Sequence, residues 1–175
     1  MENIVEAAFY PKRKGIRIKD YDYNQNGAYF VTVCAEKMRC LFGKVEPDIV
    51  GANCVRPVMS NIGKIIESEI HIMSNTYDDV FVDKYVIMPN HVHMIIMLEI
   101  GISGRTQFAP TISRMIKQFK GSVTKKLDRP IWQKSFYDHV IRNEKDYLRI
   151  WEYIEYNPLR WVDDECYNAN TAIHK

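Results

Sequence analysis

The spacing of apolar side chains divides the chain into short strands and amphipathic helices. Runs of β-branched and aromatic residues indicate strands, because successive side chains of an extended segment point to opposite faces. Apolar residues that recur every three or four positions indicate helices. The predicted strands are residues 28–34, 41–46, 80–88, 91–98 and 131–141, and the predicted helices are residues 59–73, 112–123 at least, and 144–156.

The order of these elements predicts the fold class. A strand, a helix, a hairpin, a helix and a strand follow one another, which is typical of a split βαβ, ferredoxin-like α+β sandwich with an antiparallel sheet. The last helix, which Asn143 can cap and Asn157-Pro158 can stop, is an addition to that pattern. We expect all 175 residues to form one domain, with its core at about residues 26–161 between a basic N-terminal arm and a short tail.

Composition narrows the class of protein. The chain is 46% hydrophobic and 26% charged, as is usual for soluble globular proteins. We find no apolar run of the ~18 residues that a membrane-spanning helix requires, and no signal peptide at the N-terminus. The four cysteines form no CxxC pair. These features predict a cytoplasmic protein with reduced thiols and no membrane partner.

Charge gives one local signal, although the net charge is only +2. Basic residues and tyrosines alternate in the N-terminal arm, and this mixture suits DNA phosphates and unstacked bases. A solvated basic arm would show the same pattern. The candidate DNA-binding residues are Arg13, Lys14, Arg17 and Lys19, with Lys12 beside them and Tyr10, Tyr21 and Tyr23 around them.

Two histidines on a predicted strand form a candidate metal site. His91 and His93 are two positions apart, so their side chains project from the same face while Val92 points to the other. Adjacent imidazoles supply half of a metal site and need further ligands from elsewhere. The alternative is a pair of hydrogen-bonded histidines on the face of a sheet.

The last helix carries a tyrosine and an asparagine one turn apart. Tyr153 lies at the margin of the apolar stripe, where its ring can pack on protein while its hydroxyl faces a cleft. Asn157 lies four residues later on nearly the same face, so the two polar groups approach one point. A helix C-cap before Pro158 is the other interpretation of Asn157. The expected core stripe is Tyr147, Ile150, Trp151 and Ile154.

These motifs occur together in a known family. The stretch Pro89-Asn90-His91-Val92-His93 resembles the HUH motif, histidine-hydrophobic-histidine, of small single-tyrosine transposases. This family includes insertion-sequence enzymes and the REP-associated tyrosine transposases. Three further segments, residues 26–32, 131–142 and 153–158, resemble the family's first strand, the segment before its catalytic helix and the end of that helix. The resemblance runs from about residue 13 to residue 161.

The resemblance implies a reaction and a set of roles. It implies that Tyr153 is the nucleophile, and that His91, His93 and Asn157 hold a divalent cation, Mn²⁺ or Mg²⁺. The expected activity is nicking and strand transfer of single-stranded DNA with hairpin ends, through a 5′-phosphotyrosine. Because the phosphoester is conserved, no nucleotide cofactor is needed. An asparagine at position 157 favours the REP-associated branch over members that have glutamine there, and a homodimer is expected.

Other assignments stay open at this point. His139 and the nearby Arg142 are possible accessory residues that could orient the tyrosine or a phosphate, although a structural hydrogen bond would also explain His139. His71 and His174 are interpreted as incidental. The alternative functions are a replication-initiator or relaxase-type nickase, a non-catalytic nucleic-acid-binding ferredoxin-like module, and a metallohydrolase that uses bound water.

Overall fold

The computed structural model describes residues 26–46, 57–99 and 111–163. The basic arm with its four candidate DNA-binding residues lies outside this part of the chain. The elements are β1 (Gly27–Cys34), the 3-10 helix η1 (Glu36–Met38), β2 (Gly43–Lys44), β3 (Val58–Met59), α1 (Asn61–Thr76), β4 (Val80–Ile87), β5 (His91–Leu98), α2 (Ile112–Leu127), β6 (Tyr137–Ile141), α3 (Glu144–Tyr156) and the 3-10 helix η2 (Pro158–Asp163).

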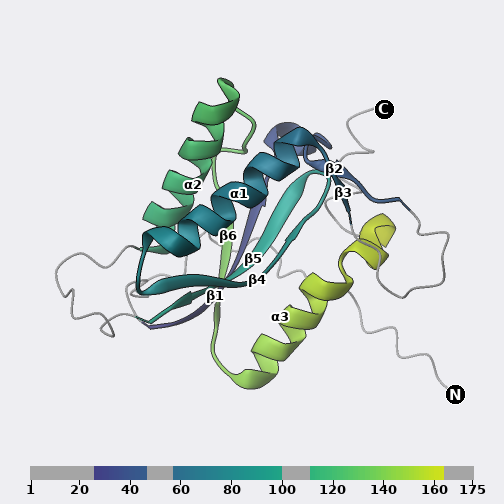
Figure 1. Ribbon diagram of the computed structural model, residues 1–175. Coiled ribbons are helices and arrows are strands. Elements are labelled where there is room, and N and C mark those ends of the chain that lie inside the picture. Colours follow the sequence, from purple (N-terminus) through teal and green to yellow (C-terminus); the bar gives the residue numbers. More distant parts are fainter. Residues whose placement is uncertain (1–25, 47–56, 100–110, 164–175) are drawn as a thin grey trace, which may run out of the picture.

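Four strands form one antiparallel sheet in the order β4-β5-β1-β6. Strands β1 and β4 flank β5, so β1, α1 and β4 form a split βαβ unit, and α2 and β6 complete the ferredoxin-like order. Helices α1 and α2 lie together on one side of the sheet and α3 lies on the other (Figure 1). The predicted α+β class and the extra C-terminal helix are therefore confirmed.

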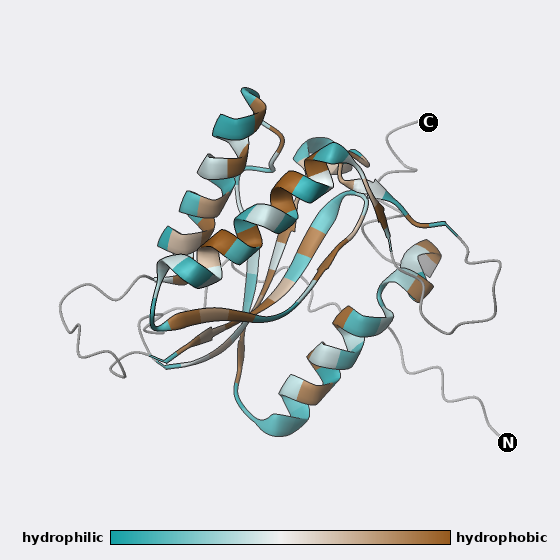
Figure 2. Cartoon of the chain, viewed as in Figure 1, coloured by the Kyte–Doolittle hydropathy of each residue, from teal (hydrophilic) through white to brown (hydrophobic). Residues whose placement is uncertain are grey.

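The alternation of side chains along β1 separates two layers of core. Tyr29, Val31 and Val33 are fully buried in the larger core, which α1 and α2 cover. Ala28 and Phe30 point to the opposite face, where they contact the smaller core beneath α3. Figure 2 shows apolar residues interleaved with polar ones along the helices, as expected for helices that bury one face.

Each long helix begins at a side-chain cap. The Ser60, Thr111 and Asn143 side chains accept hydrogen bonds from the backbone amides of Gly63, Arg114 and Asp146. Such caps each contribute about 1 kcal/mol to stability, because they satisfy backbone donors that the helix leaves unpaired. The prediction that Asn143 caps the last helix is confirmed.

The predicted strand at residues 131–141 is wrong in its first half, because β6 begins only at Tyr137. Trp132 forms an isolated bridge with Ala35, and its ring packs in the core. The Lys120 ammonium donates to the backbone oxygen of Gln133 at 2.6 Å and to the next two carbonyls at 3.3 Å. Three consecutive carbonyls of this segment thus face a lysine side chain, and regular pairing of β6 with β1 starts only at Tyr137.

The predicted strand at residues 41–46 is reduced to β2, which pairs with β3 in a separate two-stranded sheet. The approach of these strands requires glycine, since a Cβ at Gly43 would lie 2.4 Å from the Val58 carbonyl oxygen. In the part of the chain described above, we find no helix long and apolar enough to cross a membrane.

Candidate active site

The two histidines of β5 lie side by side on the face of the sheet that α3 covers. In the strand register His91 is opposite Cys34 and His93 is opposite Thr32 on β1. Both side chains are fully buried, and their ring centroids are 4.4 Å apart. The expected juxtaposition of the two imidazoles on a central strand is therefore present.

Each histidine has its Nδ1 atom engaged by a neighbouring side chain. His91 Nδ1 lies 2.8 Å from Asn90 Oδ1, and His93 Nδ1 lies 2.8 Å from the Thr32 hydroxyl. Histidines that bind metals commonly use one ring nitrogen as the ligand while the other is held by a hydrogen bond. In such an arrangement the Nε2 atoms would be the ones that face a cation.

The electrostatic environment keeps His93 neutral. Burial lowers the pKa of His93 well below its usual range, and the neighbouring His91 lowers it further. The neutral imidazole is the form that has a lone pair to donate to a metal. The protonation state of His93 near neutral pH therefore suits a ligand.

Tyr153 reaches this pair from α3 of the same chain. Its hydroxyl oxygen lies 3.2 Å from His93 Nε2, and the two ring centroids are 5.2 Å apart. Phe30 packs edge-on against the Tyr153 ring at a centroid distance of 6.0 Å. The ring is thus held by protein contacts while its hydroxyl lies next to His93.

The other tyrosines of α3 are placed differently. The Tyr147 hydroxyl donates to Asp83 Oδ2 at 2.5 Å, and this hydrogen bond, together with burial, raises the pKa of Tyr147 to about 12. Its ring is packed as expected. Tyr156 is exposed. A phenol with a raised pKa is a poorer source of phenolate, so the geometry favours Tyr153 as the nucleophile candidate.

Asn157 ends α3 one turn after Tyr153. Its side chain is almost fully buried, with Oδ1 shielded from solvent. Its backbone is right-handed helical, with φ −57° and ψ −41°, so it lacks the left-handed conformation of the usual asparagine cap. As predicted, α3 ends at Tyr156 and Asn157 follows as its C-cap residue, and the separate 3-10 helix η2 begins at Pro158.

The donor set of these residues fits a divalent cation. Two buried imidazole nitrogens and a carboxamide oxygen are donor types that suit Mn²⁺ and tolerate Mg²⁺. Within residues 26–46, 57–99 and 111–163, we find no group of three or more His, Cys, Asp or Glu side chains that could hold a metal. A cation bound by the protein at His91 and His93 would therefore need a third ligand of another type, such as Asn157.

The buried stripe of α3 is narrower than predicted. Trp151 is 36% exposed, whereas Ile150 and Ile154 are buried beneath the helix. The Lys84 ammonium lies 3.8 Å above the Trp151 ring. The prediction that Trp151 belongs to the core stripe is wrong, because Trp151 lies at the margin of the buried face of α3. The Lys84 ammonium from β4 covers its ring.

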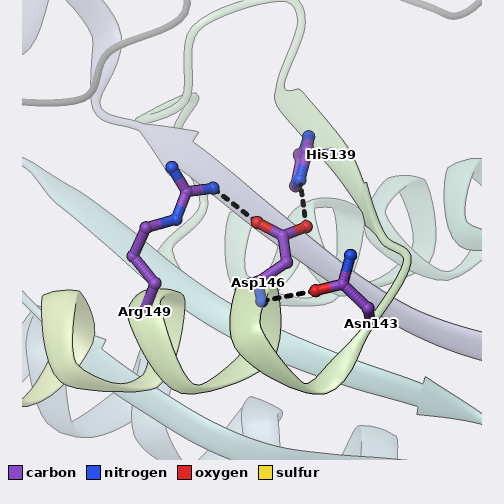
Figure 3. A network of polar contacts seen from close by, with 4 residues as sticks. All are labelled: His139, Asn143, Asp146 and Arg149. Carbon is purple, nitrogen blue, oxygen red and sulfur yellow. Dashed lines mark hydrogen bonds and ion pairs between the residues drawn. The ribbon is translucent and has the colours of Figure 1, made fainter.

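His139 contacts the first turn of α3, away from Tyr153. Its Nε2 lies 2.8 Å from Asp146 Oδ2, and Asp146 also pairs with Arg149 (Figure 3). The Asn143 cap lies in the same network. His139 therefore joins β6 to the first turn of α3, which supports its structural interpretation. Arg142 is exposed in the turn between these two elements.

Two residues of the site were missed from the sequence. Thr32, a buried polar residue on an apolar strand, contacts His93. Trp161 of η2 packs with its ring centroid 5.9 Å from that of His91. The polar residue within the strand is a signal for Thr32, whereas Trp161 lies beyond the end of α3 and no helical spacing indicates it.

Comparison with known proteins identifies relatives of the chain. No family model matches it. An uncharacterised protein of Haemophilus influenzae is 32% identical over 174 residues, which is 89% of this chain and 93% of that protein. A second protein of this bacterium, provisionally named a REP-associated tyrosine transposase, is 30% identical over 82 residues, or 42% of this chain. The REP-associated tyrosine transposase of Escherichia coli K12 is 35% identical over 83 residues, or 46% of this chain.

The match to the two named transposases is partial, since this chain spans 47% of the length of each. Among solved structures, that of a REP-associated tyrosine transposase bound to a REP hairpin superimposes with a TM-score of 0.58 at 22% identity. The superposition covers 78% of this chain and 68% of that one. It shows that the fold is shared.

Proposed function

Because the chain belongs to the family of the REP-associated tyrosine transposases, we propose that it is a metal-dependent nickase and strand-transferase of single-stranded DNA. One observation carries the proposal: the Tyr153 hydroxyl lies 3.2 Å from Nε2 of His93 within a buried pair of histidines. This contact supports the proposal, because the reaction needs the proposed nucleophile next to the proposed ligands of a cation.

The proposed reaction exchanges one phosphoester for another. The Tyr153 oxygen attacks the scissile phosphorus, the bond from phosphorus to the 3′ oxygen breaks, and a 5′-phosphotyrosine forms. The phenol loses its proton and the leaving oxygen gains one, so the other product is a free 3′-hydroxyl. A 3′-hydroxyl of another strand can reverse the step, which makes strand transfer independent of a nucleotide cofactor.

His91, His93 and Asn157 are the proposed ligands of Mn²⁺ or Mg²⁺. When bound, the cation would polarise the scissile phosphate and stabilise the charge that develops during attack. The residues of the chain hold the reacting groups in place. The sheet holds the imidazoles, and packing against Phe30 holds the ring of Tyr153, so little freedom is lost when the reacting atoms meet.

The proposed substrate is single-stranded DNA with hairpin ends. The structurally similar transposase is bound to a REP hairpin, and this supports a DNA hairpin as the partner of the present chain. The basic arm, with Arg13, Lys14, Arg17 and Lys19, would neutralise backbone phosphates. Binding through the arm predicts affinity that falls as the salt concentration rises.

A homodimer is proposed as the assembly. Leu148, Leu159 and Val162 are exposed apolar residues on α3 and η2, where a second copy could cover them. Tyr153 already lies at the histidines of its own chain, so a partner is not needed to complete the site. Light scattering after gel filtration measures the mass in solution, and a monomeric mass would refute the dimer.

The function is tested by trapping the covalent intermediate. The full chain is incubated with a labelled single-stranded hairpin DNA and Mn²⁺ and then run on a denaturing gel. A protein–DNA adduct is expected, and it should vanish in Tyr153→Phe, His91→Ala and His93→Ala and on chelation of the metal. Tyr156→Phe, which changes an exposed tyrosine on the same helix, is the matched control and should keep the adduct.

The same assay separates the alternatives. Cleavage that survives Tyr153→Phe without an adduct would indicate a metallohydrolase. Binding of the hairpin without cleavage in any condition would indicate a non-catalytic module. An adduct formed equally by Tyr153→Phe and the two histidine variants would refute the site assignment.

A further inference from the structure

Asn90 connects the proposed metal site to a turn at the end of β1. Its side chain is fully buried at the corner of the β4–β5 hairpin. The amide nitrogen Nδ2 donates to the backbone oxygen of Met38 at 3.2 Å, and Oδ1 lies 2.8 Å from His91 Nδ1. One carboxamide therefore contacts both a backbone carbonyl and a candidate ligand.

These two contacts determine where the protons are. The Met38 carbonyl has no proton to give, so the atom of Asn90 that faces it must be the NH₂ group. Oδ1 then faces His91, and because Oδ1 can only accept, His91 must carry its proton on Nδ1. The lone pair of His91 is consequently on Nε2, which is shielded from solvent.

The turn that holds Asn90 is itself fixed by the fold. Lys37 and Met38 both have φ of 54°, in the left-handed region that non-glycine residues seldom adopt. Two backbone hydrogen bonds join the flanks of this turn to the hairpin corner, from Ala35 to Asn90 and from Phe42 to Pro89, at 2.7 and 2.9 Å. The Met38 side chain packs in the small cluster that contains Met88 and Trp161.

His93 is held in a different way. Its Nδ1 atom contacts the hydroxyl of Thr32, which can donate or accept and therefore permits either tautomer. The Asn90 carboxamide is oriented by its hydrogen bond to Met38, whereas the Thr32 hydroxyl can act as donor or acceptor. The tautomer is therefore fixed by its neighbour for His91 but not for His93.

We propose that Asn90 is a positioning residue that holds His91 in the Nδ1–H tautomer, so that its Nε2 atom would be the one to bind a cation at this site. The inference rests on the proposed function, because it assigns Asn90 a role toward the metal of that site.

Three variants of the full chain separate positioning from a structural role. Asn90→Ala removes both hydrogen bonds. Asn90→Asp keeps an acceptor for His91 Nδ1–H but loses the donor to Met38. Asn61→Ala, at an exposed position at the start of α1, is the control. Thermal unfolding of each variant measures the loss of stability on its own.

The first measurement is Mn²⁺ affinity by titration calorimetry. We expect Asn90→Ala to bind Mn²⁺ about 10–100-fold more weakly, the usual effect of losing a residue that orients a ligand. Asn90→Asp should retain affinity within a few-fold although it unfolds at a lower temperature. Equal weakening in both variants would indicate a structural role and overturn the proposal.

The second measurement is the tautomer of His91, read from ¹⁵N chemical shifts of labelled histidine with His91→Ala for assignment. The unsubstituted protein and Asn90→Asp should show the proton on Nδ1, and Asn90→Ala should show a mixture. A proton on Nε2 in the unsubstituted protein would refute the proposal even if the metal binds. If Mn²⁺ fails to bind the unsubstituted protein, the proposed function loses its metal, and the tautomer still decides the role of Asn90.

Discussion

His139 Nε2 lies 2.8 Å from Asp146 Oδ2, so strand β6 is joined to the first turn of α3. The contact lies at the N-terminal end of α3, whereas Tyr153 lies near its C-terminal end. The contact therefore ties the N-terminal end of α3 to the sheet at residues away from the candidate site.

Replacing Asp146 with Asn should lower stability in a pH-dependent way. Burial raises the pKa of Asp146, but hydrogen bonds from His139 and Arg149 outweigh it, and the pKa is lowered overall. A lowered carboxyl pKa stabilises the fold above the pKa of the unfolded chain, and this contribution is lost as pH falls through the lower folded value. We expect Asp146→Asn to cost roughly 1–2 kcal/mol at pH 7 and little at pH 2.

Urea unfolding at a series of pH values measures this difference. Glu152→Gln, at an exposed position on the same helix, is the control and should change stability by less than about 0.5 kcal/mol. A penalty for Asp146→Asn that does not shrink in acid would contradict the charged hydrogen bonds.

Replacing Tyr147 with Phe should leave the reaction intact and shift only stability. The hydroxyl of Tyr147 bonds to Asp83, and its pKa is raised to about 12. A raised pKa stabilises the fold below the unfolded value of about 10, and the contribution disappears as pH rises through 12. The unfolding free energies of Tyr147→Phe and the unsubstituted protein should differ by about 1 kcal/mol or less at pH 8 and converge in alkali.

The yield of the protein–DNA adduct tests whether Tyr147→Phe leaves the reaction intact. It should stay within a few-fold of the unsubstituted protein, because Tyr147 is bonded to β4 and not to the histidines. Loss of the adduct with full stability would indicate that the nucleophile is assigned to the wrong tyrosine.

Metal binding should stabilise the fold through the histidine pair. Mn²⁺ at 100 times its dissociation constant should add about 2.7 kcal/mol, because it binds only the folded chain. Thermal unfolding with and without Mn²⁺ measures the effect, which His93→Ala should abolish. His71→Ala, which changes an exposed histidine on α1, should retain it.

Truncating one buried side chain of α3 should disturb the position of Tyr153 relative to the histidines. Ile154 is 1% exposed and packs between the helix and the sheet. Ile154→Ala should cost about 2–4 kcal/mol and reduce adduct formation, since Tyr153 lies next to the cavity. Lys145→Ala, at an exposed site on the same helix, should cost less than about 0.5 kcal/mol. Equal effects of the two variants on adduct yield would show that packing beneath α3 does not position Tyr153.

Local spacing predicted the parts of the fold that depend on short-range geometry. The period of two residues placed His91 and His93 on one face, and the helical period placed Tyr153 and Asn157 one turn apart. The same rules failed at residues 131–136, where burial of Trp132 and the hydrogen bonds of Lys120 override a sequence that favours a strand. They also failed at Trp151, because the pattern does not show how wide a stripe the sheet covers.

The rest of the site depends on contacts between distant segments. Thr32 meets His93 across 61 residues, and Asn90 meets Met38 across 52 residues. No periodicity relates such positions, since they become neighbours only when β1 pairs with β5. The ligand candidates were therefore visible in the sequence, and the residues that hold them were not.

The small number of buried residues beneath α3 has a thermodynamic consequence. Helix α3 buries two residues, Ile150 and Ile154, whereas α1 and α2 bury five each, and β5 lies between two paired neighbours. Detaching α3 should therefore require less free energy than opening the sheet. Hydrogen exchange should then find amides of α3 exchanging while those of β5 stay protected. The sheet would then keep the candidate metal ligands in place while α3 separates from it. DNA attached to Tyr153 could therefore move together with the helix.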